Sequence, residues 1–258
     1  MVQHLVAFHS SISPNTLTEL GVIDDTVLTQ PSPTRIRVPA DLTTIDWAYA
    51  GGVNLWYGEI VAPSVEVRRM SLRIIPQNRG SITPYVSNAI YFSPPAEVSL
   101  VATEDLSVIA LQAGAAAEDI VALVQFKAPG PKPAVPAGDV RLLRATGGVT
   151  LTPYKWTLVS PVFDKALEPG EYAVVGFIAI SDNMIASRLI FPGAVYRPGV
   201  LGFSGGEGGA LIYDGDFREV IQGYEFGRFT HINPPMIECL SAVADTWQVF
   251  YFYVVKTA

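Results

Sequence analysis

Short apolar segments separated by turn residues recur along the whole chain, which is the pattern of β-strands joined by tight turns. In the first half, strands are expected at Gln3–Ala7, Thr34–Val38, Val53–Val61, Val65–Ile75, Tyr85–Phe92, Glu97–Val101, Leu106–Leu111 and Ile120–Lys127. In the second half, they are expected at Val140–Arg144, Thr150–Ser160, Glu171–Ser181, Ile185–Phe191, Glu225–Ile232 and Thr246–Lys256. About eight strands per half is the number in a jelly roll. The pattern predicts an all-β protein with two jelly-roll β-sandwich domains side by side and a few short helices.

Helical features are confined to three short segments. Asp216 and Glu219 are spaced as in a capping box, and apolar residues follow at helical spacing, so a helix is expected to begin at Asp216. The other two expected helices are Thr44–Ala50, which precedes a pair of glycines, and Ala113–Asp119. None is long enough to be the crossover helix of a βαβ unit, which argues against a parallel α/β architecture.

A proline-rich segment, 128–138, divides the chain almost at its midpoint. It holds four prolines and two glycines in eleven residues. Proline fixes φ and removes a backbone donor, so this segment is expected to be an extended connector, not a helix or central strand. The predicted domains are therefore residues 1–127 and 139–258, with 128–138 as the linker.

Two strands in the second half are apolar at nearly every position, namely Tyr172–Ile180 and Val249–Val255. Strands of this kind are covered on both faces, by a second domain, a loop or a neighbouring subunit. The composition points the same way, because apolar residues make up 49% of the chain and charged residues only 16%. A monomer with so few charges would expose large apolar patches, so an obligate assembly is expected.

The charge balance argues against nucleic-acid binding. The chain has a formal net charge of −7, whereas phosphate-backbone binding requires an excess of Lys and Arg. The one basic cluster, Arg68, Arg69 and Arg73, is interpreted as a solvated or interface-paired strand edge. Cys239 is the only cysteine and is expected to be a small buried apolar group. No Lys or Arg precedes Arg35, so we expect no signal peptide.

A G-x-S-x-G pattern spans 202–206 and places Ser204 where many hydrolases carry their nucleophile. Asp214 or Asp216, and then His231, follow in the order of a catalytic triad. However, more glycines follow Ser204, where a nucleophile elbow requires a helix, and the predicted fold lacks a parallel sheet. We therefore expect Ser204 to lie in a loop without catalytic function.

No other residues form a convincing catalytic, metal or cofactor site. His4, His9 and His231 are too scattered in sequence to bind a metal together by local spacing. Asp214 and Asp216 could offer oxygens to Ca²⁺, but the rest of an EF-hand loop is missing, and a turn with a helix cap explains them as well. The sequence therefore predicts a protein without a catalytic site, a metal or a cofactor.

The two halves resemble the double jelly-roll major capsid proteins of tailless icosahedral DNA viruses, including phages. The segments that carry the resemblance are the proline-rich junction 128–138, the pair Phe92–Pro95 and Ile232–Pro235, the strand and turn Leu167–Gly176, and Ala48–Gly52 followed by Ile60–Pro63. The paired segments also hint at an internal duplication.

This resemblance implies a homotrimer with a pseudo-sixfold outline that tiles the shell of a virion assembled in the host cytoplasm. Its partners would be other copies of the chain and other capsid proteins, such as vertex proteins. In several such viruses an internal membrane lies beneath the shell. The family has no catalytic residues to carry over.

A two-domain β-sandwich binding module, lectin-like or part of a phage fibre, is the alternative. Such a module would use exposed aromatic and amide side chains on loops, and Trp47, Trp56, Asn54 and Asn183 are the residues available. A hydrolase using Ser204 is the third reading.

Overall fold

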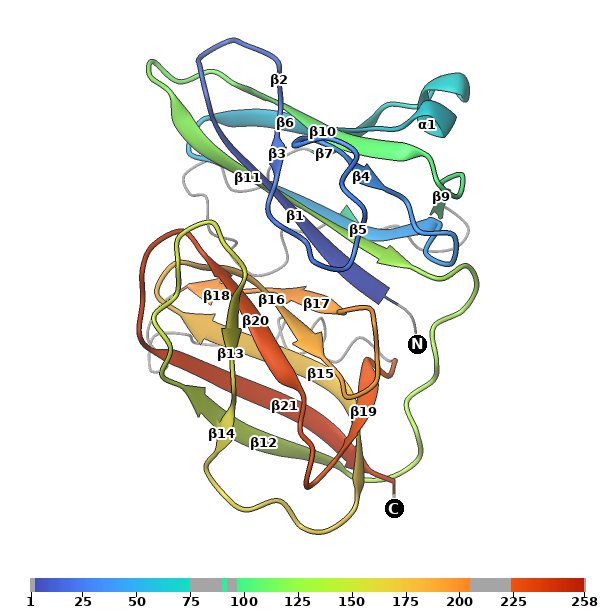
Figure 1. The fold of residues 1–258 in the computed structure, drawn as a ribbon, viewed down its shortest axis with the longest axis vertical. Helices are drawn as coiled ribbons and strands as arrows, with labels where there is room; N and C mark the ends of the chain where they lie inside the picture. Colours follow the sequence, from blue (N-terminus) through green and yellow to red (C-terminus); the bar gives the residue numbers. More distant parts are fainter. Residues whose placement is uncertain (1–2, 75–89, 92–96, 205–223, 258) are drawn as a thin grey trace. The chain divides into compact units, whose positions relative to one another are not determined.

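The computed structural model describes residues 3–74, 90–91, 97–204 and 224–257, which are drawn as coloured ribbons in Figure 1. Contacts divide the chain into two compact units that meet in sequence between Pro129 and Gly130. We call them the first unit and the second unit. Each is a β-sandwich of two sheets, which confirms the predicted all-β class. In these ranges no helix is long and apolar enough to cross a membrane.

The first unit is built from two sheets. Its elements are β1 (Gln3–Ile12), β2 (Thr18–Glu19), β3 (Gly21–Val22), β4 (Ile36–Arg37), β5 (Thr44–Gly51), β6 (Leu55–Val61), α1 (Pro63–Val67), β7 (Leu72–Ile74), β8 (Ile90–Tyr91), β9 (Val98–Ser99), β10 (Asp105–Gln112) and β11 (Glu118–Lys127). The larger sheet has the order β3-β1-β11-β5-β8, and β9 also pairs with β5. The smaller sheet has the order β2-β10-β6-β7, and β4 also pairs with β10.

The second unit repeats this plan. Its strands are β12 (Val140–Gly147), β13 (Thr157–Val159), β14 (Val162–Phe163), β15 (Glu171–Ser181), β16 (Met184–Ile190), β17 (Gly199–Leu201), β18 (Phe203–Ser204), β19 (Gly227–Thr230), β20 (Met236–Ser241) and β21 (Gln248–Lys256). The larger sheet has the order β14-β12-β21-β15-β18, with β19 also on β15, and the smaller has the order β13-β20-β16-β17.

The long strands of the two units have the same order, and each order is that of a jelly roll; the edge strands differ, since β8 is antiparallel to β5 whereas β18 is parallel to β15. In each larger sheet the last strand of the unit (β11 or β21) lies between the first long strand (β1 or β12) and the first strand of the central hairpin (β5 or β15). In each smaller sheet the penultimate strand (β10 or β20) pairs with the second strand of that hairpin (β6 or β16). Two sheets connected in this way form the double Greek key of a jelly roll.

The two units also carry β-bulges at equivalent places. In the larger sheets the bulged residue is Asp46 on β5 and Val175 on β15. In the smaller sheets it is Trp56 on β6 and Ile185 on β16. Because an inserted residue leaves part of the ladder unpaired, bulges are specific features that families retain. Shared strand order and shared bulges together support an internal duplication.

Aromatic rings fill the core of the second unit. Phe177 on β15 lies with its ring centre 6.1 Å from that of Phe250 and 4.8 Å from that of Phe252, both on β21. Phe163 on β14 adds a further contact with Phe252 at 5.4 Å. Alternate residues of β15 and β21 point into this core, as expected for strands in a sandwich.

The opposite face of β15 and β21 is also buried within one chain. Val175, Ile178 and Val255 are fully covered, and Val135 and Phe203 pack against this second cluster. The prediction that these apolar strands are covered on both faces is therefore correct. Because the single chain already covers them, these strands give no support to the expected obligate assembly.

Several local predictions were wrong. Thr150–Ser160 was expected to be one strand, but only Thr157–Val159 forms one, β13. Thr44–Ala50 is strand β5, not a helix, because all of its residues are buried within the larger sheet. Ala113–Asp119 forms the turn between β10 and β11 and the start of β11. The segment Val65–Ile75 was expected to be one strand, but it contains part of α1, a turn and β7. The helix expected at Asp216 and most of the expected strand Tyr85–Phe92 lie outside the described residues.

Candidate functional site

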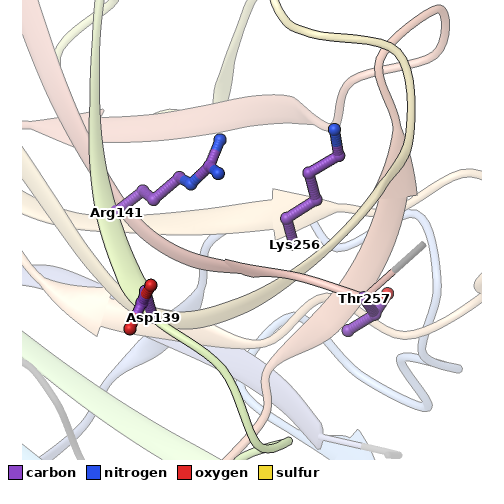
Figure 2. Close-up of a pocket in the computed structure, with 4 residues that line it drawn as sticks. All are labelled: Asp139, Arg141, Lys256 and Thr257. Atoms are coloured by element: carbon purple, nitrogen blue, oxygen red, sulfur yellow. The ribbon is translucent and has the colours of Figure 1, made fainter.

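A polar hollow lies at the beginning of β12 and the end of β21. Figure 2 shows the residues that line it: Asp139, Arg141, Lys256 and Thr257. Arg141 and Lys256 converge on one acidic side chain, since Glu168 Oε2 lies 2.9 Å from Arg141 Nη1 and 3.4 Å from Lys256 Nζ. The turn before β15 positions Glu168, and its carbonyl oxygen accepts a hydrogen bond from the Tyr172 hydroxyl at 2.7 Å.

The charges of this hollow compensate each other. Hydrogen bonds from Arg141 and Lys256 hold the pKa of Glu168 below its ordinary value, and Glu168 raises the pKa of Arg141. Nearby, Glu171 accepts a hydrogen bond from the Thr257 hydroxyl at 3.1 Å. Both shifts move the pKa away from neutral pH, whereas a general acid or base needs a pKa near the working pH. The hollow is thus lined by surface ion pairs at the strand ends.

A second charged cluster lies on the smaller sheet of the second unit. Arg188 on β16 faces Glu238 on β20, and Arg188 Nε donates to the Glu238 carboxylate. Arg197 Nη1 reaches the same carboxylate at 2.6 and 2.8 Å. The Trp156 ring covers Arg188, with its centre 4.2 Å from the guanidinium carbon. Sequence reasoning missed this cluster, although an arginine within an otherwise apolar strand is a signal for a buried ion pair.

The structure describes only part of the triad that the G-x-S-x-G motif suggests. Ser204 ends the short strand β18, and its hydroxyl accepts a hydrogen bond from the Asn183 N–H at 3.0 Å. His231 Nδ1 accepts from the Gly170 N–H at 3.1 Å, so its hydrogen bond belongs to another turn. Asp214 and Asp216 lie outside the described residues, as do the glycines after Ser204.

The histidines pair with carboxylates one at a time. His4 Nε2 lies 2.8 Å from Asp25 Oδ2, and both side chains are fully buried. His9 Nε2 lies 3.1 Å from Asp119 Oδ1 near the surface. Among the residues that the structure describes, no group of three or more His, Cys, Asp or Glu side chains is placed to hold a metal ion.

The aromatic and amide residues named for a binding module are not all on the surface. Trp47 is only 2% exposed, so it cannot contact a ligand, whereas Trp56 is 52% exposed beside the hairpin that joins β5 to β6. Asn54, in the same hairpin, is bound through its side-chain amide and backbone N–H to Glu118. Asn183 occupies a turn with φ of 56°. Trp56 is therefore the one of the four that offers an open aromatic surface.

The basic cluster lies at and after the end of α1, not on one strand. Arg68 follows the helix, and its Nε donates to the Ser64 carbonyl at 2.8 Å. The Arg73 guanidinium carbon lies 4.7 Å from the centre of the Tyr57 ring. Two of these arginines thus make contacts within their own unit.

Comparisons with known proteins identify no family for this chain. No protein-family model matches it, and no curated protein matches its sequence. One solved structure is similar over 97% of this chain and 98% of its own: the crystal structure of the major capsid protein P2 from bacteriophage PM2. The two share 9% sequence identity, with a TM-score of 0.24. A TM-score this low does not establish a common fold.

Proposed function

We propose that this chain is the major capsid protein of an icosahedral DNA virus or phage, and that homotrimers with a pseudo-sixfold outline assemble into its shell. The observation that carries the proposal is the match between the two units. Both are jelly rolls whose long strands have the same order and carry bulges at equivalent residues.

The match supports the proposal through symmetry. Three copies of a chain with two similar domains present six similar corners, which can pack on a hexagonal lattice. Homo-oligomers generally close with point-group symmetry, and a trimer is the simplest closed assembly with this outline. The low charged content of 16% also favours extensive contacts between copies.

The proposal assigns the function to surfaces and edges instead of a catalytic centre. The partners are further copies of the chain, other capsid proteins such as vertex proteins, and an internal membrane if the shell encloses one. The chain acts in the virion after assembly in the host cytoplasm, and it does not read nucleic-acid sequence. The ion-pair networks around Glu168 and Glu238 act as structural supports.

The mass of the native protein in solution tests the proposal. We expect light scattering to report a trimer or a multiple of it, and electron microscopy to show regular shells or sheets. A stable monomer at micromolar concentration that forms no particles would contradict it. That result would favour the binding-module alternative, in which the exposed Trp56 should bind a sugar on a glycan array.

A further inference from the structure

The first strand of the second unit, β12, has an open edge. β12 pairs with β21 along its whole length, but its other neighbour, β14, pairs only with Ala145 and Thr146. One more hydrogen bond extends this contact, from the Asp164 N–H to the Arg144 carbonyl at 3.1 Å. The part of β12 from Val140 to Leu143 has no strand beside it among the residues that the structure describes.

The backbone groups at this edge are available for pairing. In an antiparallel strand, successive residues direct their N–H and C=O groups to opposite sides. Arg144 directs its carbonyl toward β14, so Leu142 and Val140 direct theirs toward the same open edge. In the described part of the chain, neither residue has a hydrogen-bond partner on this side. An edge of this kind is a template for another β-strand.

The side chains beside this edge are apolar and exposed. Val140 is 47% and Leu142 54% exposed, and both lie on the same face because they are two residues apart. Apolar residues exposed along an unpaired edge favour strand addition, in which backbone hydrogen bonds supply affinity and alternate side chains supply specificity.

The first unit shows what an equivalent edge looks like when it is covered. Gln3 and Leu5 on β1 occupy the positions of Val140 and Leu142, because both strands pair in the same way with the last strand of their unit. Gln3 is 1% exposed and Leu5 is fully buried. The segment after β3 lies along this edge, since the Ile23 N–H donates to the Ala7 carbonyl at 2.9 Å and Asp25 lies 2.8 Å from His4. The second unit keeps the strand but leaves its edge open.

The two arginines of β12 are paired with carboxylates of their own chain, which lowers the repulsion between two such edges. Arg141 is paired with Glu168 at 2.9 Å. Arg144 is paired with both oxygens of Asp164, at 2.7 and 3.0 Å. Like charges directly opposite on paired strands are destabilising, and each of these arginines brings its own carboxylate.

We propose that this edge binds the same edge of a second copy of the chain, forming an antiparallel strand pair across a twofold axis. Asp164 blocks the edge beyond Leu143, and Gly138, with φ of 145°, precedes the strand. A pairing between two copies must avoid Asp164 and use the free backbone groups of Val140 and Leu142. It therefore places Val140 opposite Leu142 of the second copy. Arg141 then lies opposite its counterpart, next to the two Glu168 carboxylates.

This pairing extends the larger sheet of one copy into that of the next. It rests on the proposed function only for its role in the shell, where it would join one trimer to another. Strand pairing between two isolated chains does not depend on trimers.

Disulfide cross-linking of Arg141→Cys tests the pairing. Residues opposite each other at a non-hydrogen-bonded position have Cα atoms about 4.5 Å apart, which is within the range that a disulfide spans. Cys239 is buried, so the engineered thiol is the accessible one. We expect mild oxidation to give a covalent dimer. Ile232→Cys is the matched control, because Ile232 is more exposed but lies outside β12.

The double variant Val140→Lys, Leu142→Lys provides an independent measurement in the otherwise unchanged chain. Lysine on an edge strand opposes pairing, so sedimentation should show less association while circular dichroism remains unchanged. If trimers persist and only larger species disappear, both proposals hold. If Arg141→Cys cross-links no more than Ile232→Cys and the lysine variant associates normally, the pairing is refuted, whatever the trimer result. Cross-linked dimers without trimers would refute the capsid assembly alone.

Discussion

Replacing Glu238 with alanine removes the carboxylate shared by Arg188 and Arg197. The Arg188 side chain is only 1% exposed, and Trp156 covers its guanidinium group. The variant therefore leaves a buried positive charge without this carboxylate. Arg197 is 16% exposed and lies in the loop after β16, so it can turn toward water at little cost.

The expected loss of stability follows from this burial. Breaking a buried ion pair by removing one partner costs about 3 to 5 kcal/mol, because the remaining charge cannot recover its hydration. An exposed pair gives much less, typically under about 1 kcal/mol. Arg144 and Asp164, which are 32% and 41% exposed, form such a pair in the same unit. Asp164→Asn is therefore the matched control.

Urea unfolding measured by tryptophan fluorescence gives the free energy of unfolding for each variant, and Trp156 reports directly on the cluster. Arg188→Met, Glu238→Leu removes both buried charges and should restore much of the stability lost in Glu238→Ala, since apolar replacements of buried pairs are often neutral or stabilising. A loss for Glu238→Ala no larger than that for Asp164→Asn would refute the reasoning. It would show that water reaches Arg188.

Three further predictions concern single residues of the second unit. Phe252→Ala should cost about 3 to 5 kcal/mol in urea unfolding, because it empties space between Phe163 and Phe177; a loss below about 1 kcal/mol would show that this core is loosely packed. Burial raises the pKa of the Cys239 thiol, so iodoacetamide should not label the folded protein even at pH 9 and should label it in denaturant; rapid labelling of the folded protein would contradict the burial. Ser204 should not react with a fluorophosphonate probe, and labelling that is lost in Ser204→Ala would instead establish a hydrolase.

The strand pattern predicted the long strands well, because their period and composition are local properties. Glu171–Ser181 was expected as a strand with the bounds of β15. The predictions failed where one local pattern is compatible with two structures. Gly51 and Gly52 after Thr44–Ala50 resemble a helix stop, but Gly51 is the last residue of β5 and Gly52 begins the turn to β6. Tertiary pairing with β11 decides the conformation there.

The functional features depend on contacts between distant residues, so sequence alone could not locate them. Ser204 was expected to lie in a loop, but it ends β18, which pairs with β15 over two residues. β20 was not predicted, although Glu238 between the buried Ile237 and Cys239 fits the alternation of a strand. The carboxylate of Glu238 is explained by Arg188 and Arg197, which are fifty and forty-one residues away in sequence. The open edge of β12 appears only from the pairing of β12 with β14 and β21.

The pairing of β1 with β11, and of β12 with β21, determines when each unit can fold during synthesis. In both larger sheets the strand made last occupies a place between strands made earlier. Gln3 cannot pair until Lys127 has been made, and Val140 cannot pair until Val255 has been made. Such distant pairings slow folding, because the chain must close a long loop before the contacts form. Each jelly roll therefore stays open until its final strand leaves the ribosome, and the first can close while the second is still being made.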